Sequence, residues 1–554
     1  MSPETSAGDA PSVIVIGGGI AGLATACYAR MSGLRTQVFE KHVLPGGCCT
    51  AWGRDGYIFD YCIEWLPGTA AGNEAHRVWR ELGALDGKSI TNFEMFNRVV
   101  GTDGREVTFY NDPDRLERHL LEVSPADSRP IRSFCRDLRR FLAAADFPFL
   151  VPGPLQTRRQ KLAALARMLP AASLYRRTAT ADMPSFTGGL RDPLLRQAFP
   201  FIFFQDHGRF PLLPYLLNMA AAHHGNAGFP EGGSLGLARS VERRYLDLGG
   251  DIRYRARVER ILVEDGRAVG VQLRDGTRHH ADHVVSACDG ATTIYRMLAG
   301  RYTGPVVDRL YEDLLHRPEE VYPGVLSAFV GVDGELPPDT PHSTTYLLSE
   351  QDCAALPGVA QRSIVVQLRS KYWAGCAPPG KSLLHCTFFT DFGSWRELRR
   401  SNRREYRARK ERVATFVRSF LERQYPGLDE RVESVDVATP VTQHRYTGNF
   451  AGSILAWKSF GAADDLLAQL VDRDRMRLPG LRGFSMAGQW VGGGGLIRAA
   501  SSGRHAAQFL CQELGVPFRA WESDQQQEPW DPGMLGELPL LDRKPARHDG
   551  RGQR

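Results

Sequence analysis

Three glycines and one carboxylate near the N-terminus have the spacing of a loop that binds phosphate. Gly17, Gly19 and Gly22 form a G-x-G-x-x-G pattern, and Glu40 follows 18 residues after the last of them. Gly17 permits a tight turn, Gly19 lets the backbone approach a pyrophosphate, and Gly22 lets a helix pack closely on a strand. The N–H groups at the start of that helix would hold the phosphates, and Glu40 would accept hydrogen bonds from ribose hydroxyls. The pattern therefore indicates a dinucleotide without a 2′-phosphate.

The segments around this loop must place it at the end of a buried sheet. Residues 13–16 are a continuous β-branched run, which is typical of a strand buried on both faces of a parallel sheet. Residues 23–32 predict a helix that ends at Gly33, and residues 36–39 predict a second strand that ends in Glu40. A G-x-G-x-x-G pattern alone is weak evidence, but a strand, loop, helix, strand and terminal acid in this order are specific.

A second glycine pair decides between NAD and FAD, which share this fingerprint. Gly46 and Gly47 follow Glu40 after five residues, an extension typical of FAD-binding flavoproteins. Other short glycine clusters occur at 232–233 and 492–495. Glycine is used in this clustered way where the backbone must come close to a ligand. The sequence thus favours FAD as the dinucleotide.

The stretch from Pro45 to Asp60, PGGCCTAWGRDGYIFD, resembles the phytoene desaturase, carotenoid isomerase and retinol saturase superfamily of FAD-dependent oxidoreductases. Its GGCC run, followed by an aromatic residue, a glycine turn and a Phe-Asp pair, is most similar to the retinol saturase branch. The resemblance implies an α/β fold with a Rossmann-like FAD-binding domain of the glutathione reductase or amine oxidase type. That domain would be assembled from three segments and would carry an inserted α+β substrate domain.

The resemblance also implies where the domains begin and end. Three separated segments would supply the FAD domain, two insertions the substrate domain, and a tail rich in Pro, Gln and alternating charge would be partly disordered. The FAD segments are 11–75, 225–295 and 478–516, the insertions are 76–224 and 296–477, and the tail is 517–554.

A set of FAD-binding residues follows from the resemblance. Val258 stands where the family contacts adenine through its backbone, and the block around Gln489 would line the flavin end of the site. Helix N–H groups there would stabilise negative charge on a reduced flavin. The expected non-covalent site consists of Gly17, Gly19, Ile20, Ala21, Gly22, Glu40, Lys41, Gly46, Gly47, Cys48, Val258, Gly488, Gln489, Gly493, Gly494 and Leu496.

Five residues are candidates for roles in catalysis, although the motifs assign none of them. His444, Arg445 and Tyr446 follow a segment that resembles the T-P-x-T run preceding the last FAD block. Glu64 stands where a histidine is common in the family, and Arg498 stands where small or apolar residues are usual. Directed inward, Arg498 could position a carboxylate or a carrier-linked substrate, but we expect it to face solvent.

The family adds or removes hydrogen at C=C bonds of polyenes, or isomerises them. We therefore expect an FAD-dependent oxidoreductase that acts on C=C bonds of a lipophilic conjugated polyene or isoprenoid-like substrate, and the GGCC run favours saturation. Desaturation or cis–trans isomerisation of a carotenoid or polyene, for example in bacterial secondary metabolism, stays open. So does a non-catalytic lipid-binding protein on the same fold. Because the sequence has no second G-x-G-x-x-G, NAD(P)H would reach the flavin without a domain of its own, or quinone or oxygen would exchange electrons with it.

The first insertion holds a run of Phe, Leu and Met over residues 194–219. Such a run fits an elongated apolar pocket and fits a buried helix equally well. Asp206 and His207 lie between its two halves and could exchange protons, but a hydrogen-bonded loop pair is the expectation we favour.

Residues 151–180 carry six basic side chains and no acidic one. Leu162, Leu165, Met168 and Leu169 have helical spacing on what would be the opposite face. This profile is typical of a peripheral helix that contacts a membrane surface, and it also fits an acidic carrier protein. A lid helix and an ordinary solvated helix are the alternatives.

Composition excludes several other classes of protein. The net charge of +6 over 554 residues is too dilute to indicate nucleic acid as a partner. No apolar run approaches the roughly 18–20 residues that span a bilayer, and residues 1–11 do not resemble a signal peptide. The ten cysteines show neither zinc spacing nor a disulfide framework, so we expect no metal site. We expect a cytoplasmic bacterial protein, peripheral to the inner face of the membrane, and leave its oligomeric state open.

Overall fold

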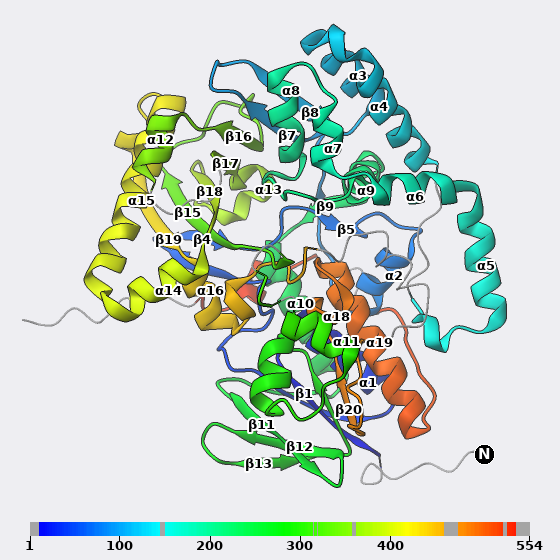
Figure 1. Cartoon of the computed structure of the whole chain (residues 1–554). Coiled ribbons are helices and arrows are strands. Elements are labelled where there is room, and N and C mark those ends of the chain that lie inside the picture. Colours follow the sequence, from blue (N-terminus) through cyan, green and yellow to red (C-terminus); the bar gives the residue numbers. More distant parts are fainter. Residues whose placement is uncertain are drawn as a thin grey trace, which may run out of the picture.

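The computed structural model describes residues 10–143, 150–313, 315–317, 320–356, 362–458, 475–524 and 529–538. Figure 1 shows two bodies, one built around a parallel sheet at the bottom of the view and one around a larger sheet at the top. Because three segments that lie far apart in the sequence contribute to the lower body, the chain crosses between the bodies several times.

The lower body contains a five-stranded sheet in which all neighbouring strands are parallel. The first two strands form the predicted unit around the glycine loop, and the others come from two downstream segments. In sheet order the strands are β10 (Asp251–Arg253), β2 (Arg35–Phe39), β1 (Ser12–Ile16), β14 (His283–Ser286) and β20 (Phe484–Met486).

Three helices form a close-packed group beside this sheet: α1 (Ile20–Met31), α10 (Gly233–Asp247) and α19 (Leu496–Leu514). In α1 all residues but Arg30 are buried, because the helix contacts both of the others and the sheet. A Cβ atom at Gly503 of α19 would lie 2.4 Å from the carbonyl oxygen of Ala21. This glycine therefore allows α19 to lie directly on α1.

A three-stranded antiparallel sheet packs beside β14. Its strands are β11 (Val258–Glu264), β12 (Arg267–Leu273) and β13 (Arg278–His280).

The upper body contains a seven-stranded mixed sheet that is antiparallel except where β16 pairs with β7. One face of β15 (Gly324–Val332) and β18 (Ser382–Thr390) packs against α15 (Arg403–Gln424) through residues such as Leu326, Leu384 and Phe388. The sheet order is β19 (Val432–Ala438), β15 (Gly324–Val332), β18 (Ser382–Thr390), β17 (Ser363–Leu368), β16 (Ser343–Leu347), β7 (Met95–Val100) and β8 (Glu106–Tyr110).

Helices of the first insertion cover the β7–β8 end of this sheet and enclose a second hydrophobic core. The apolar run predicted to be either a pocket or a buried helix supplies much of that core, including Leu195, Phe199 and Leu216. The helices are α3 (Pro113–Val123), α4 (Ser128–Leu142), α6 (Ala172–Thr180), α7 (Met183–Gly188), α8 (Pro193–Ala198) and α9 (Leu212–His223). Helix α5 (Arg158–Met168) lies at the outer edge of the molecule (Figure 1).

Shorter elements connect the two bodies and complete the described chain. The strands are β3 (Ala51–Arg54), β4 (Tyr57–Asp60), β5 (Leu66–Pro67), β6 (Ile90–Thr91) and β9 (Ala227–Pro230). The helices are α2 (Glu74–Glu81), α11 (Pro305–Val307), α12 (Glu350–Ala355), α13 (Arg369–Tyr372), α14 (Phe392–Ser401), α16 (Pro440–Thr447) and α18 (Gln489–Gly492).

Part of the C-terminal region that we expected to be disordered is packed against the protein. Trp530 and Leu535 are buried with Leu235 in a small hydrophobic cluster, and a Cβ atom at Gly232 would lie 2.4 Å from the indole of Trp530. Residues 529–538 of this tail thus pack on the protein, because their apolar side chains find a hydrophobic site. Residues 525–528 and 539–554 lie outside the described part of the chain.

Two findings about the described residues bear on a membrane span and on a metal site. Within that part of the chain no helix is both long enough and apolar enough to span a bilayer. No group of three or more His, Cys, Asp or Glu side chains with the geometry of a metal site occurs there either.

Candidate functional site

A cavity of about 730 Å³ receives its lining from both bodies. The carboxyl ends of β1, β2 and β14 border it on one side, and the strands β15 and β18 border it on the other. Its size is that of a site for a small molecule or cofactor, and the carboxyl edge of a parallel sheet is where such sites usually form.

The start of α1 lies at this cavity. Gly17, Gly19, Ile20 and Ala21 line it, and the helix begins at a glycine cap with no acidic residue in its first turn. The first N–H groups of a helix have no partner within the helix, so this end can bind an anion. Gly22 is not part of the lining; a Cβ atom there would lie 1.9 Å from the carbonyl oxygen of Gly17. Gly22 thus serves the packing of α1 on β1 and does not face a ligand.

Glu40 directly follows β2 and is buried in the wall of the cavity. Its carboxylate accepts hydrogen bonds from the N–H groups of Gly18 and His42, each at 2.7 Å. Burial raises the pKa of Glu40, although these two N–H groups act in the opposite direction. Lys41 also lines the cavity, and burial lowers its pKa. The acid is therefore fixed to the glycine loop, at the place where the fingerprint predicts a ribose.

The other predicted cofactor residues surround the same cavity with one exception. Gly46, Gly47, Cys48, Val258, Gly488, Gln489, Gly494 and Leu496 all line it. Gly493 does not line it; its N–H donates to the carbonyl of Gln489 in the short helix α18. The N–H of Gly46 donates to the carbonyl of Gly18 at 2.8 Å, which ties the two glycine segments together.

The lining fits a flavin dinucleotide. A second helix, α19, also starts at the cavity with a glycine cap and no acid in its first turn, and Leu496, Ile497 and Arg498 line the wall. Two helix N-termini therefore direct their positive ends to one cavity. One of them can bind the negative pyrophosphate, and the other can stabilise negative charge on the ring. A Cβ atom at Gly46 would lie 2.1 Å from the carbonyl of Cys49, so this loop can follow its path only with glycine.

The candidates on α16 divide into two groups. His444 and Arg445 line the cavity, whereas Tyr446 does not. The ring of Tyr446 packs edge-on against the ring of His42, with centroids 5.0 Å apart. His444 is oriented by a contact of 2.9 Å between its Nδ1 and the carbonyl oxygen of Asn449. The structure therefore does not place Tyr446 at the site.

Glu64 also lines the cavity, and its carboxyl has an unusual environment. Burial raises the pKa of Glu64 to about 7, while Arg369 and the amide of Gln367 act in the opposite direction. The Nε2 atom of Gln367 lies 3.4 Å from Oε1 of Glu64. Arg369 compensates only in part because it forms a buried ion pair of 2.9 Å with Asp60. A carboxyl that is about half protonated near neutral pH can act as a general acid or base.

Arg498 does not follow the expectation that it faces solvent. It lines the cavity, and its charge opposes the rise that burial causes in the pKa of Tyr322. The reason is its position in the first turn of α19, which starts at the cavity wall. The chain thus provides a cation inside the site.

Several residues that line the cavity belong to none of the cofactor motifs described from the sequence. Part of the apolar run in the first insertion lines the cavity, as a pocket would require. The rest of the run is buried in the hydrophobic core, as a buried helix would be. His207 lies there with Nε2 3.4 Å from the carbonyl of Phe203, and burial lowers its pKa to about 4. The added residues include Tyr61, Trp65, Phe203, Gln205, His207, Phe210, Tyr322, Ser327, His385, Thr387 and Phe389.

One sequence signal pointed to some of these residues. In β15 and β18, Ser327, His385 and Thr387 interrupt otherwise apolar strands. Successive strand residues face opposite sides of a sheet, so polar residues spaced by two mark one polar face. That face turns out to line the cavity.

Comparisons with known proteins agree with this geometry. A family model described as flavin containing amine oxidoreductase matches residues 20–511. A chloroplastic prolycopene isomerase of Daucus carota is 26% identical over 533 residues, which cover 91% of this chain and 80% of that protein. An all-trans-retinol 13,14-reductase of Danio rerio is 24% identical over 475 residues, covering 80% of this chain and 76% of that protein.

The solved structures show the same fold. A cyclohexylamine oxidase from Brevibacterium oxydans superimposes with a TM-score of 0.54 at 14% identity, over 91% of this chain and all of that one. The α/β architecture with a Rossmann-like cofactor domain and an added substrate domain is therefore as the sequence predicts.

Proposed function

The chain belongs to the flavin containing amine oxidoreductase family, and from this membership we propose that it is an FAD-dependent oxidoreductase acting on carbon–carbon bonds of a lipophilic conjugated polyene. The observation that supports this most directly is the shared cavity, which joins the glycine loops at one side to aromatic side chains such as Trp65, Phe203 and Phe389 at the other. Two relatives that match most of the chain are named for prolycopene and for all-trans-retinol, both polyenes.

FAD, when bound, supplies hydride transfer to or from the carbon skeleton. The N–H groups at the start of α1 would hold the pyrophosphate, and the carboxylate of Glu40 would accept hydrogen bonds from the ribose hydroxyls. The start of α19, with Leu496, would stabilise negative charge on the flavin ring. The aromatic wall excludes water from the bond that reacts.

Addition of hydrogen to a C=C bond needs a proton as well as a hydride. Glu64 carries a proton in about half of the molecules at neutral pH, because burial raises its pKa to about 7. His207 and His385 are neutral there, since burial lowers the pKa of each, so neither carries a proton to donate as a cation. Glu64 is therefore the group we assign to proton transfer.

Saturation is the direction we favour, because the GGCC run is most similar to the retinol saturase branch and the 13,14-reductase is among the relatives. Isomerisation is the second candidate, and the prolycopene isomerase relative supports it. NAD(P)H would act as the electron donor by approaching the flavin directly. No second dinucleotide loop occurs in the sequence to bind it separately.

One experiment separates these reactions. The flavin-loaded enzyme is reduced anaerobically with NADPH or with dithionite and mixed with all-trans-retinol or with prolycopene. A product heavier by two hydrogens supports saturation, and an isomer of unchanged mass supports isomerisation. Oxidised enzyme that gives a product lighter by two hydrogens would show desaturation. A purified protein with neither flavin absorbance nor affinity for FAD would instead favour a non-catalytic lipid-binding role.

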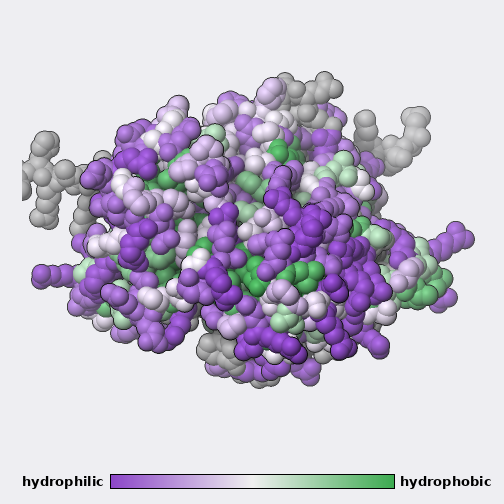
Figure 2. All heavy atoms as spheres, turned by 90° about the horizontal axis from the view of Figure 1, so that it is seen from above, coloured by the Kyte–Doolittle hydropathy of each residue, from purple (hydrophilic) through white to green (hydrophobic). Residues whose placement is uncertain are grey.

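We further propose that the enzyme takes up its substrate at an anionic membrane surface through α5. Leu162, Leu165 and Leu169 are 66%, 57% and 65% exposed, so they do not pack on the protein. Figure 2 shows apolar residues next to hydrophilic ones at the outer edge where α5 lies in Figure 1. The segment 151–180 contains no acidic residue, and its basic side chains other than Arg177, which pairs with Asp137, would attract anionic lipids. A lipid surface therefore fits this helix better than a solvated role.

A further inference from the structure

Buried polar atoms without a hydrogen-bond partner gather on one wall of the cavity. Among the residues that the structure describes, this is true of Nδ1 of His207 and of atoms on three further side chains: Oε1 of Gln205, Oγ of Ser327 and both ring nitrogens of His385. The three side chains are only 6%, 0% and 4% exposed, and all three line the cavity. A buried polar group without a partner costs free energy, so such a cluster at a binding site indicates a ligand group that completes it.

The sheet register brings these atoms together. Ser327 of β15 lies directly opposite Thr387 of β18, and His385 is the next residue of β18 on the same face. The amide nitrogen of Gln205 donates to the hydroxyl of Thr387 at 3.0 Å and to its carbonyl at 3.2 Å. Because that carbonyl can only accept, the amide oxygen of Gln205 must point away from Thr387. The ring of His385 is held by stacking on Phe329, with centroids 4.1 Å apart.

The chemistry of this cluster selects one kind of ligand group. Ser327 offers a hydroxyl that can donate or accept, neutral His385 offers one donor and one acceptor, and Gln205 offers an acceptor. A hydroxyl group both donates and accepts, so it can satisfy all three residues. A hydrocarbon satisfies none of them, and a carboxylate would face the oxygen of Gln205 without a proton to give it.

We propose that Gln205, Ser327 and His385 bind a hydroxyl group of the substrate, so that the preferred polyene is an alcohol and not a hydrocarbon carotenoid. This inference rests on the proposed function and specifies its substrate class. The hydroxyl fixes the position of the chain along the cavity, and thereby determines which double bond reaches the reacting centre. The three residues are thus specificity determinants and not members of the catalytic machinery.

The test measures binding without turnover. Flavin-loaded, oxidised enzyme is titrated with all-trans-retinol and with the hydrocarbon in which a methyl group replaces its CH₂OH group, and the change in the flavin spectrum gives each Kd. The wild type is expected to bind the alcohol about 10-fold more tightly or better, because the hydrocarbon leaves the polar atoms unpaired. Ser327→Ala and His385→Phe should each lower this preference toward 1 while the Kd of the hydrocarbon changes little. His385→Phe keeps an aromatic ring to stack on Phe329.

Ser363→Ala is the matched control. Its hydroxyl is equally buried in β17 of the same sheet and has no hydrogen-bond partner within the described residues, but Ser363 does not line the cavity. This variant should keep the full preference for the alcohol. Equal Kd values for alcohol and hydrocarbon in the wild type would overturn the inference, as would variants that weaken both ligands equally. If both polyenes bind with equal Kd, the proposed function stands and only this inference fails; if neither binds, both fail.

Discussion

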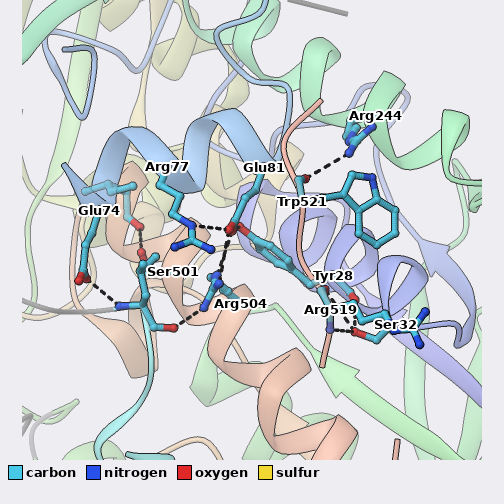
Figure 3. Close-up of polar contacts among 12 residues, drawn as sticks. Tyr28, Ser32, Glu74, Arg77, Glu81, Arg244, Ser501, Arg504, Arg519 and Trp521 are labelled. Carbon is cyan, nitrogen blue, oxygen red and sulfur yellow. Dashed lines mark hydrogen bonds and ion pairs between the residues drawn. The ribbon is translucent and has the colours of Figure 1, made fainter. Parts of the chain in front are cut away.

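The Nε atom of Arg504 in α19 lies 3.0 Å from Oε2 of Glu81 in α2, and both side chains are almost completely buried (Figure 3). The carboxylate of Glu81 also accepts a hydrogen bond of 2.8 Å from the hydroxyl of Tyr28 in α1, and Arg77 binds its other oxygen at 3.0 Å. One acid therefore joins three helices that come from distant parts of the sequence. Two of these helices begin at the cofactor cavity, so the ion pair supports the geometry of the site.

Removal of Arg504 should destabilise the protein strongly. Arg504→Met leaves the carboxylate of Glu81 buried without its main cationic partner, and we expect a loss of about 3–5 kcal/mol in the free energy of unfolding. The double variant with Glu81→Gln should regain part of this loss, because no uncompensated charge remains. Chemical denaturation of the four proteins of this double-mutant cycle measures both effects. A single variant as stable as the wild type would show that the pair contributes nothing.

Gly22→Ala should reduce the flavin content and the thermal stability together. The new methyl group would lie 1.9 Å from the carbonyl oxygen of Gly17, so α1 must move away from β1 and the loop between them must change. Flavin absorbance per protein after purification and the melting midpoint report the two effects. Gly188→Ala in α7 is the control, since a Cβ atom there meets no atom within 4 Å. A Gly22→Ala protein with full flavin content would contradict the packing role.

The first cofactor-binding unit could be predicted because each of its features is local in sequence. Residues 13–16 are within β1, and the predicted second strand is within β2. The helix begins at Ile20, three residues before the predicted start, because the end of the glycine motif forms its first turn. Helix boundaries of this kind depend on hydrogen bonds that the residue pattern does not show.

The substrate side could not be predicted in the same way, because it is assembled by pairing of distant strands. Ser327 and Thr387 are 60 residues apart in the sequence and become neighbours only through the register of β15 and β18. Glu64 attracted attention only as a departure from a family histidine, and its raised pKa depends on burial beside residues more than 300 positions away. Arg498 was expected outside because arginine is usually exposed, but the start of α19 lies at the cavity.

Replacement of the exposed leucines of α5 (Arg158–Met168) and of Leu169, which directly follows it, should weaken binding to anionic vesicles. We expect the variant with Leu162, Leu165 and Leu169 changed to Ser to sediment with vesicles containing phosphatidylglycerol at least about 10-fold less well, because it loses apolar area that would enter the lipid interface. High salt should weaken the wild type as well, since the basic residues contribute electrostatically. Leu246→Ser removes an exposed leucine from α10 and should have no effect. If the triple variant sediments with the vesicles as well as Leu246→Ser does, the proposed contact with a lipid surface is wrong. An acidic carrier protein would then be the favoured partner.

Glu64→Gln should remove a step from the pH dependence of saturation. In the wild type the carboxyl of Glu64 has a pKa of about 7, so the rate of product formation should fall as the pH rises through that value and the proton is lost. Glutamine cannot donate such a proton, and the variant should react slowly with no step near pH 7, while its Kd for the polyene changes little. Rates of flavin reoxidation by substrate in single-turnover experiments measure this. Glu350→Gln, which changes an exposed acid, should retain the step.

The raised pKa of Glu64 also predicts how the free energy of unfolding changes with pH. The folded protein holds the proton of Glu64 more tightly than the unfolded chain, whose pKa is that of an ordinary glutamate near 4.5. Its contribution should therefore make the protein less stable as the pH rises from about 4.5 to about 7, by on the order of 3 kcal/mol in total, and should be constant above that range. Glu64→Gln should be more stable than the wild type at pH 8 and similar at pH 4.5, as measured by urea unfolding. A variant that loses stability at pH 8 would mean that the ionised carboxylate, bound by Arg369 and Gln367, is the form that the fold favours.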